Sequence, residues 1–206
     1  MEFKKIQLNG FKSFAERTNF LIEDGLTGIV GPNGCGKSNI VESLRWVMGE
    51  TSAKSMRGSG MEDVIFSGTS NKASKNIAEV SIEVENKEKE GPIQYRELEN
   101  IQVRRKIEKD KGSKFYINDK EVRARDAQMF FADLSTGAHS PSMISQGRIG
   151  ALVTAKPTDR RAILEEAAGI SGLHVRRHEA ELRPVSYTHL RAHETVLDLV
   201  CRLLLE

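Results

Sequence analysis

The sequence is poor in cysteine and contains no long apolar run. Its 206 residues include only two cysteines, Cys35 and Cys201. Two cysteines this far apart do not make a disulfide framework, and they suit a reducing cytoplasm. No stretch of about 18 apolar residues occurs, so no membrane-spanning helix is expected. The first six residues, Met-Glu-Phe-Lys-Lys-Ile, also lack the apolar core of a secretory signal.

The chain has no strong excess of either charge. Lysine and arginine number 31 against 29 acidic residues, a formal net charge of +2, so net charge alone does not predict a nucleic-acid partner. Nine basic residues nevertheless fall within 22 positions, where they form either a solvated hairpin rim or a surface for the DNA backbone. They are Arg104, Arg105, Lys106, Lys109, Lys111, Lys114, Lys120, Arg123 and Arg125.

One motif is strong. Residues 31–38 read Gly-Pro-Asn-Gly-Cys-Gly-Lys-Ser and fill every fixed position of the phosphate-binding pattern G-x-x-x-x-G-K-[ST]. The three glycines let the backbone curl tightly, so that its N–H groups point at phosphate oxygens. Lys37 supplies a cation for the β- and γ-phosphates, and Ser38 offers a hydroxyl to Mg²⁺. The motif predicts a site for a nucleoside triphosphate.

The sequence on both sides of this loop supports the same interpretation. Residues 26–30, Leu-Thr-Gly-Ile-Val, form a short and mostly apolar run that predicts a buried strand. From Ser38 to Met48, apolar residues recur at helical spacing. A strand, a glycine loop and a helix would place the anion at a helix N-terminus, where N–H groups and the helix dipole favour phosphate.

The remaining pattern predicts an α/β protein. Strands are expected at 2–8 and 19–22, and alternating apolar residues at 77–84, 101–107 and 115–117 predict an antiparallel meander. A helix is expected at 123–134. From Pro157 to Arg183 the sequence predicts a strongly charged helix with a weak 3.5-residue apolar register, as at the start of a coiled coil.

Six segments carry further motifs. They are Leu8–Ala15, Gly31–Asn39, Lys54–Gly58, Met61–Gly68, Ile144–Ile149 and Arg160–Ile170. In this order they resemble the N-terminal region of SMC proteins, the chromosome-organising ATPases, and the likeness is closest to bacterial SMC. The resemblance covers residues 1 to about 183 without a gap.

The resemblance implies the N-terminal half of an ABC-type P-loop ATPase head, an α/β fold with an antiparallel β subdomain. Residues 1–156 would form this half, and 157–183 a neck helix that begins a coiled coil. Residues 184–206 depart from the family pattern and are expected to be a non-native, chimeric tail. A full-length relative would use ATP to engage two heads and act on DNA in chromosome condensation and segregation, in the cytoplasm at the nucleoid.

The resemblance also assigns site residues. Lys37, Arg57 and Gln146 match catalytic positions, and Gln146 would join Ser38 in binding Mg²⁺. Arg57 matches an arginine that reaches toward the nucleotide and supports hydrolysis, as arginine fingers do. The residues expected to contact ATP are Lys12, Ser13, Pro32, Asn33, Gly34, Cys35, Gly36, Lys37, Ser38, Asn39, Asp63 and Gln146.

Half of the family's composite site has no counterpart in this sequence. The strand ending in Asp-Glu and the Leu-Ser-Gly-Gly loop are both missing. In the family they come from the C-terminal half of the head and from a second head, and kleisin subunits bind the assembly. Three alternatives remain open: a coiled-coil ATPase of DNA repair, a stand-alone P-loop kinase or GTPase, and a DNA-binding module that uses the basic hairpin.

Residues 1–183 alone should bind ATP weakly and hydrolyse it negligibly, because the general base and half of the phosphate clamp are missing. An ATPase assay on this purified segment measures the rate. A turnover of about one per second would contradict the prediction.

Overall fold

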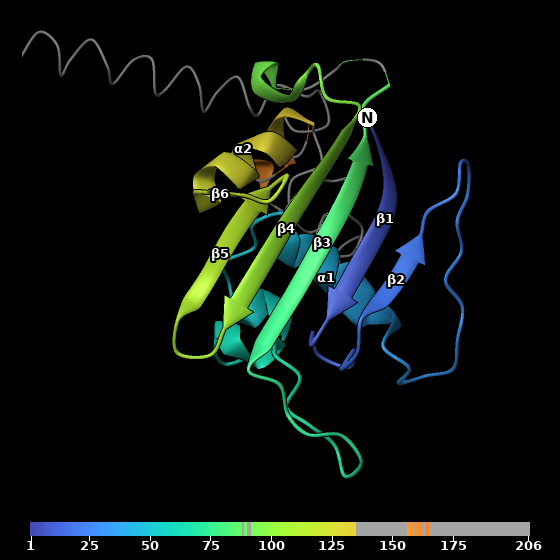
Figure 1. The fold of residues 1–206 in the computed structure, drawn as a ribbon, viewed down its shortest axis with the longest axis vertical. Coiled ribbons are helices and arrows are strands. Elements are labelled where there is room, and N and C mark those ends of the chain that lie inside the picture. Colours follow the sequence, from blue (N-terminus) through green and yellow to red (C-terminus); the bar gives the residue numbers. More distant parts are fainter. Residues whose placement is uncertain (88, 90–91, 135–155, 159, 162–163, 165–206) are drawn as a thin grey trace, which may run out of the picture.

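The computed structural model describes residues 1–87, 89, 92–134, 156–158, 160, 161 and 164. Within these residues six strands form one antiparallel sheet in the spatial order β2-β1-β3-β4-β5-β6 (Figure 1). The strands are β1 (Glu2–Asn9), β2 (Thr18–Leu21), β3 (Ile77–Glu85), β4 (Asn100–Glu108), β5 (Gly112–Ile117) and β6 (Lys120–Val122). The helices are α1 (Lys37–Val47), α2 (Ala124–Asp133) and the short 3-10 helices η1 (Lys54–Met56), η2 (Met61–Val64) and η3 (Ile93–Tyr95).

The two faces of the sheet differ in polarity because side chains alternate along each strand. One face contributes Ile6, Ile82 and Val103, which lie side by side on three neighbouring strands and are buried. Helices α1 and α2 cover this face, and their apolar side chains join it in a single core. On the other face, polar residues such as Lys5, paired with Glu83, face outward. The sheet therefore has one covered and one solvated face.

Helix α1 packs across the covered face, behind the central strands in Figure 1. Its apolar residues recur at helical spacing, so that Ile40, Trp46 and Val47 are buried together. The Trp46 ring lies 5.4 Å from the ring of Phe11, in the turn that follows β1. The helix is thereby fixed against both the sheet and the loop beside it.

A buried arginine holds the C-terminal end of α1. Arg105 lies on the covered face of β4, directly opposite Val80 and Phe115, and is only 3 % exposed. Its guanidinium donates hydrogen bonds of 2.7 Å to the backbone carbonyls of Trp46 and Glu50. Burial lowers the pKa of Arg105 to about 10, so the group stays protonated at neutral pH. The Trp46 carbonyl also accepts from the Gly49 N–H, so the arginine adds a second donor there and ties the segment just after α1 to the sheet.

Most of the predicted elements are confirmed. The strands at the N-terminus, the first two strands of the meander and both helices appear within one or two residues of the expected bounds. The third meander strand, β5, begins at Gly112, three residues before the expected start. Strand β6 was not anticipated, because its three residues are too short for a periodic pattern. The described residues among 157–164 are helical, in agreement with a helix that begins at Pro157. The rest of the neck helix and the tail at 184–206 lie outside the described residues.

The prediction of a strand at residues 26–30 is wrong. This segment has no regular structure, and Leu26 and Val30 are almost fully exposed. Its apolar composition is that of a buried strand, but a strand forms only where a neighbour accepts its backbone hydrogen bonds. None of the six strands in the described part of the chain pairs with it. None of the helices described has the length and apolar character of a membrane span.

Replacing Arg105 by methionine should lower the free energy of unfolding by about 2–4 kcal/mol, because buried carbonyls lose their donor. Urea denaturation measures the change. Arg104→Met is the matched control, since Arg104 is the adjacent arginine and lies on the solvated face in ion pairs with Glu79 and Asp119. The control should cost less than about 1 kcal/mol. Equal losses in the two variants would contradict the assigned role.

Candidate functional site

The phosphate loop has a backbone that favours glycine at two positions. Gly34 and Gly36 adopt positive φ angles of 83° and 98°. A Cβ atom on Gly36 would also lie 2.6 Å from the hydroxyl oxygen of Ser13, so the Ser13 side chain would have to move. Gly36 is therefore required both by its conformation and by the loop that packs against it.

The loop opens onto an N-terminus of α1 that suits an anion. Gly36 is the N-cap, no side chain caps the helix, and its first turn contains no acidic residue. The Asn39 N–H donates to the Gly36 carbonyl, but the N–H groups of Lys37 and Ser38 and the positive end of the helix dipole face the loop and suit a phosphate. Ser38 lies exposed in the same turn. The residues present fit a nucleoside triphosphate with Mg²⁺.

The amine of Lys37 lies inside the loop. It donates hydrogen bonds to the carbonyls of Gly31 at 2.5 Å and Pro32 at 2.6 Å. The Cys35 thiol is exposed, with its sulfur 3.8 Å from the same amine. Pro32, Asn33 and Gly34 are exposed on the loop surface. The predicted phosphate-binding residues therefore gather around the lysine ammonium.

A tight turn after β1 brings Lys12 and Ser13 to α1. The Lys12 backbone has a positive φ of 47°, and its N–H donates to the carbonyl of Val64 at 2.7 Å. The Ser13 hydroxyl accepts a hydrogen bond of 2.9 Å from the side-chain amide of Asn39. The Lys12 amine contacts the Glu42 carboxylate and the Met56 carbonyl. The structure thus brings Lys12 and Ser13 together with the first two turns of α1.

Arg57 reaches the same helix from the segment after η1. Its guanidinium donates to the Asn39 side-chain oxygen at 3.2 Å and pairs with the Glu42 carboxylate. Sequence reasoning did not find Glu42. The signal available was its place on the buried side of an amphipathic helix, where an acidic residue needs cationic partners.

The Asp63 carboxylate is engaged in hydrogen bonds within its own turn. Its carboxylate accepts hydrogen bonds from the backbone N–H groups of Ser59 and Gly60 and from the Ser59 hydroxyl, at 2.6 to 3.0 Å. These donors, that of Gly60 foremost, hold the pKa of Asp63 below its usual value. The carboxylate therefore shapes the turn into η2. Its predicted contact with nucleotide stays a prediction, and Gln146 lies outside the described residues.

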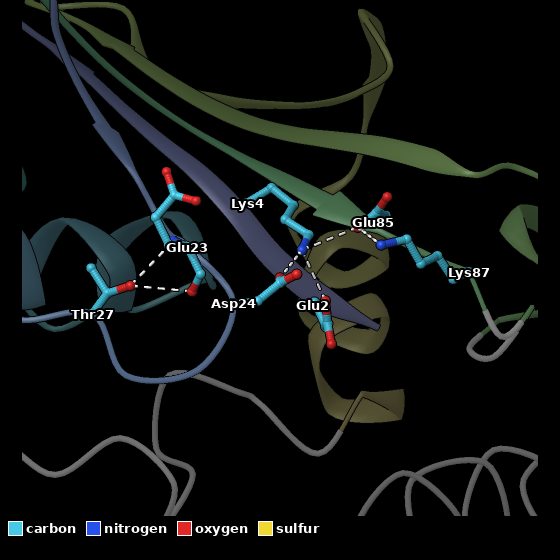
Figure 2. Close-up of polar contacts among 7 residues, drawn as sticks. All are labelled: Glu2, Lys4, Glu23, Asp24, Thr27, Glu85 and Lys87. Carbon is cyan, nitrogen blue, oxygen red and sulfur yellow. Dashed lines mark hydrogen bonds and ion pairs between the residues drawn. The ribbon is translucent and has the colours of Figure 1, made fainter.

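The segment that leads into the phosphate loop is tied to the sheet by a charged cluster, shown in Figure 2. The Lys4 amine forms ion pairs with Glu2, Asp24 and Glu85, which come from three separate segments. The hydrogen bond from Lys4 lowers the pKa of Asp24, and Asp24 in return raises that of Lys4. The Thr27 hydroxyl bonds to the Glu23 backbone. Asp24, seven residues before the loop, is thus tied to β1, whereas Leu26 and Val30 after it remain exposed.

Comparison with known proteins identifies the family. The model of the family described as RecF/RecN/SMC N terminal domain matches residues 2–148. The chromosome partition protein Smc of Cereibacter sphaeroides is 56% identical over 183 residues, which are 89% of this chain and 16% of that protein. The Smc of Rhodopseudomonas palustris is 52% identical over 200 residues, 97% of this chain and 17% of that protein. The chain therefore spans about a sixth of the length of these relatives.

Solved structures agree with the sequence comparison. An Smc head bound to the C-terminal winged-helix domain of ScpA superposes with a TM-score of 0.77 at 30% identity, over 83% of this chain and 52% of that one. An SMC ATPase from a study of ATP-driven dimerization and DNA-stimulated activation gives 0.69 at 30% identity, over 81% and 99%. The chain belongs to the RecF/RecN/SMC N-terminal domain family and corresponds to the N-terminal head region of bacterial Smc, with an ABC-type ATPase fold.

Proposed function

We propose that this chain is the ATP-binding N-terminal head segment of a chromosome-partition SMC ATPase, which acts on DNA through ATP-driven engagement of two heads. One observation carries the proposal. The glycine loop opens onto the uncapped N-terminus of α1, with the Lys37 amine inside the loop. The high identity to chromosome partition proteins favours this function over that of a DNA-repair relative.

Different groups of the loop would bind different parts of the nucleotide. Backbone N–H groups of residues 34–38 would donate to phosphate oxygens, and the Lys37 amine would exchange its carbonyl partners for the β- and γ-phosphates. The Ser38 hydroxyl, together with Gln146, would hold Mg²⁺. When bound, this ion supplies positive charge that neutralises the phosphates. Arg57 would add a second cation beside the first turn of α1.

The exposed strand-like segment supports a composite site. Leu26, Ile29 and Val30 present apolar side chains and backbone groups that another strand would cover. The chain spans about a sixth of its relatives' length, so the C-terminal half of the head is the natural source of that strand. A second head would then complete the phosphate clamp. A ScpA-like kleisin is a further proposed partner, because solved Smc heads are bound to ScpA.

The β4–β5 hairpin is the proposed DNA contact. Strand alternation removes Arg105 from the basic cluster, since it is buried on the covered face. On the solvated face Lys106 lies between Glu79 of β3 and Lys114 of β5, but Glu79 pairs with Arg104 and Lys114 pairs with Glu121. Lys106 and Lys109 make no ion pair with any described residue, whereas Lys111 pairs with Glu108. The two unpaired lysines are therefore the best phosphate ligands on the hairpin.

Mg·ATP should bind to the chain reconstituted with its C-terminal head half, and Lys37→Ala should abolish the binding heat. The reason is the loss of the only ammonium inside the phosphate loop of the described chain. Titration calorimetry measures the heat. Lys72→Ala removes an exposed lysine paired with Glu16 and should leave binding unchanged. Heat that persists at full strength in Lys37→Ala would overturn the proposed function.

The double variant Lys106→Gln/Lys109→Gln should weaken DNA binding by the reconstituted head. The slope of log affinity against log salt should fall by about one for each lysine that contacts a phosphate. Fluorescence anisotropy at several salt concentrations measures the slope. The control Lys87→Gln/Lys89→Gln removes the same charge beyond the far end of β3 (Figure 1). Equal slopes for both variants would exclude the hairpin as the contact.

A further inference from the structure

A buried carboxylate on α1 lies between two cations from distant segments. The Glu42 side chain is 10% exposed; one of its oxygens contacts the Lys12 amine and the other contacts Arg57. The Lys12 side chain is 13% exposed, whereas that of Arg57 is 59% exposed. A carboxylate this deep would be strongly unfavourable without compensating charge. Lys12 supplies that charge from within, and Arg57 lies at the solvent side.

Lys12 and Arg57 both adopt the left-handed backbone conformation, which residues other than glycine rarely adopt. Lys12 and Arg57 have positive φ angles of 47° and 54°. Each is held there by its surroundings: the Lys12 N–H donates to Val64, and the Arg57 N–H donates to Lys54. The Lys12 amine also contacts the carbonyl of Met56, the residue before Arg57. Backbone strain of this kind gathers at functional sites and persists where surrounding contacts enforce it.

Arg57 is bridged to two residues on one side of α1. Asn39 and Glu42 are three residues apart, so their side chains are neighbours on the helix surface. Both contacts of Arg57 use its Nη2 atom. An arginine has five N–H donors, and within the described residues Nε and Nη1 of Arg57 make no hydrogen bond, so they can donate to a further acceptor. Asn39 directly follows Ser38, so the guanidinium is fixed beside the proposed phosphate site.

We propose that Glu42 is a positioning residue of the nucleotide site. Its carboxylate fixes the Arg57 guanidinium beside the first turn of α1 and ties the Lys12 turn to the same place. Glu42 acts through Arg57 and need not touch the nucleotide itself. The inference rests on the proposed function, because Arg57 supports hydrolysis only if the phosphate loop binds ATP.

The variant Glu42→Gln keeps the shape of the side chain and removes its charge. In the ATPase reconstituted with its C-terminal head half and second head, kcat should fall about tenfold while KM changes less than about twofold. Arg57→Ala should lower kcat at least as much, and the double variant should be no worse than Arg57→Ala alone. Glu16→Gln removes an exposed carboxylate with a single lysine partner and should match the unmodified protein.

A second measurement needs no nucleotide. In ¹⁵N spectra of the same protein, the ion pair should slow rotation of the Arg57 guanidinium and separate its Nη signals. Glu42→Gln should merge these signals, and Glu16→Gln should not. Glu42→Asp keeps the charge beside Lys12 if Glu42→Gln fails to fold, but it is one methylene too short to hold both cations. It should therefore also lower kcat.

The outcomes separate the two proposals. If the unmodified protein neither binds nor hydrolyses ATP, the proposed function is wrong, and the role of Glu42 fails with it. If the unmodified protein is active and Glu42→Gln and Glu42→Asp match it in kcat, only the positioning role is overturned. Additive losses in kcat from Glu42→Gln and Arg57→Ala would likewise overturn it. Two residues that act through one guanidinium lose the same contribution, so their losses should not add.

Discussion

The position of helix α1 is the constraint on which the site depends. Its C-terminal end is held by the buried Arg105, which donates to the carbonyls of Trp46 and Glu50. Its N-terminal end follows the N-cap Gly36, where an added Cβ would collide with the Ser13 hydroxyl. The phosphate loop is continuous with this end. A shift of the helix along the sheet would therefore move every group that faces the phosphates.

Helix α1 has a buried cation at its C-terminal end and a buried carboxylate near its N-terminal end. At the C-terminal end, a buried cation satisfies carbonyls and stabilises the fold. Near the N-terminal end, the first turn contains no acidic side chain. Glu42 lies in the second turn, between Lys12 and Arg57. The carboxylate is close enough to hold a cation at the site and far enough along the helix to leave its first turn free for an anion. Helix polarity thus explains where each charge lies.

Strand β4 shows how alternation separates residues that a sequence places together. Arg104 and Lys106 face solvent, while Arg105 between them lies in the core. A charge count treats the three as one basic cluster. Only one of the two faces can meet DNA, and the buried arginine serves the fold. Much the same is true of the apolar segment at 26–30, whose composition suits a strand although no described strand pairs with it.

Local pattern alone determined much of this protein. The glycine loop, helix α1 and the antiparallel strands were predictable because each depends on residues near one another in sequence, through turn chemistry and periodicity. The sequence also identified Lys12, Ser13, Arg57 and the loop residues as a group, through the family resemblance. Tertiary structure decided the roles of Glu42 and Arg105 and the exposure of residues 26–30. These depend on which distant segments lie beside them, and the free energy of a buried charge or an unpaired strand is set by that neighbour.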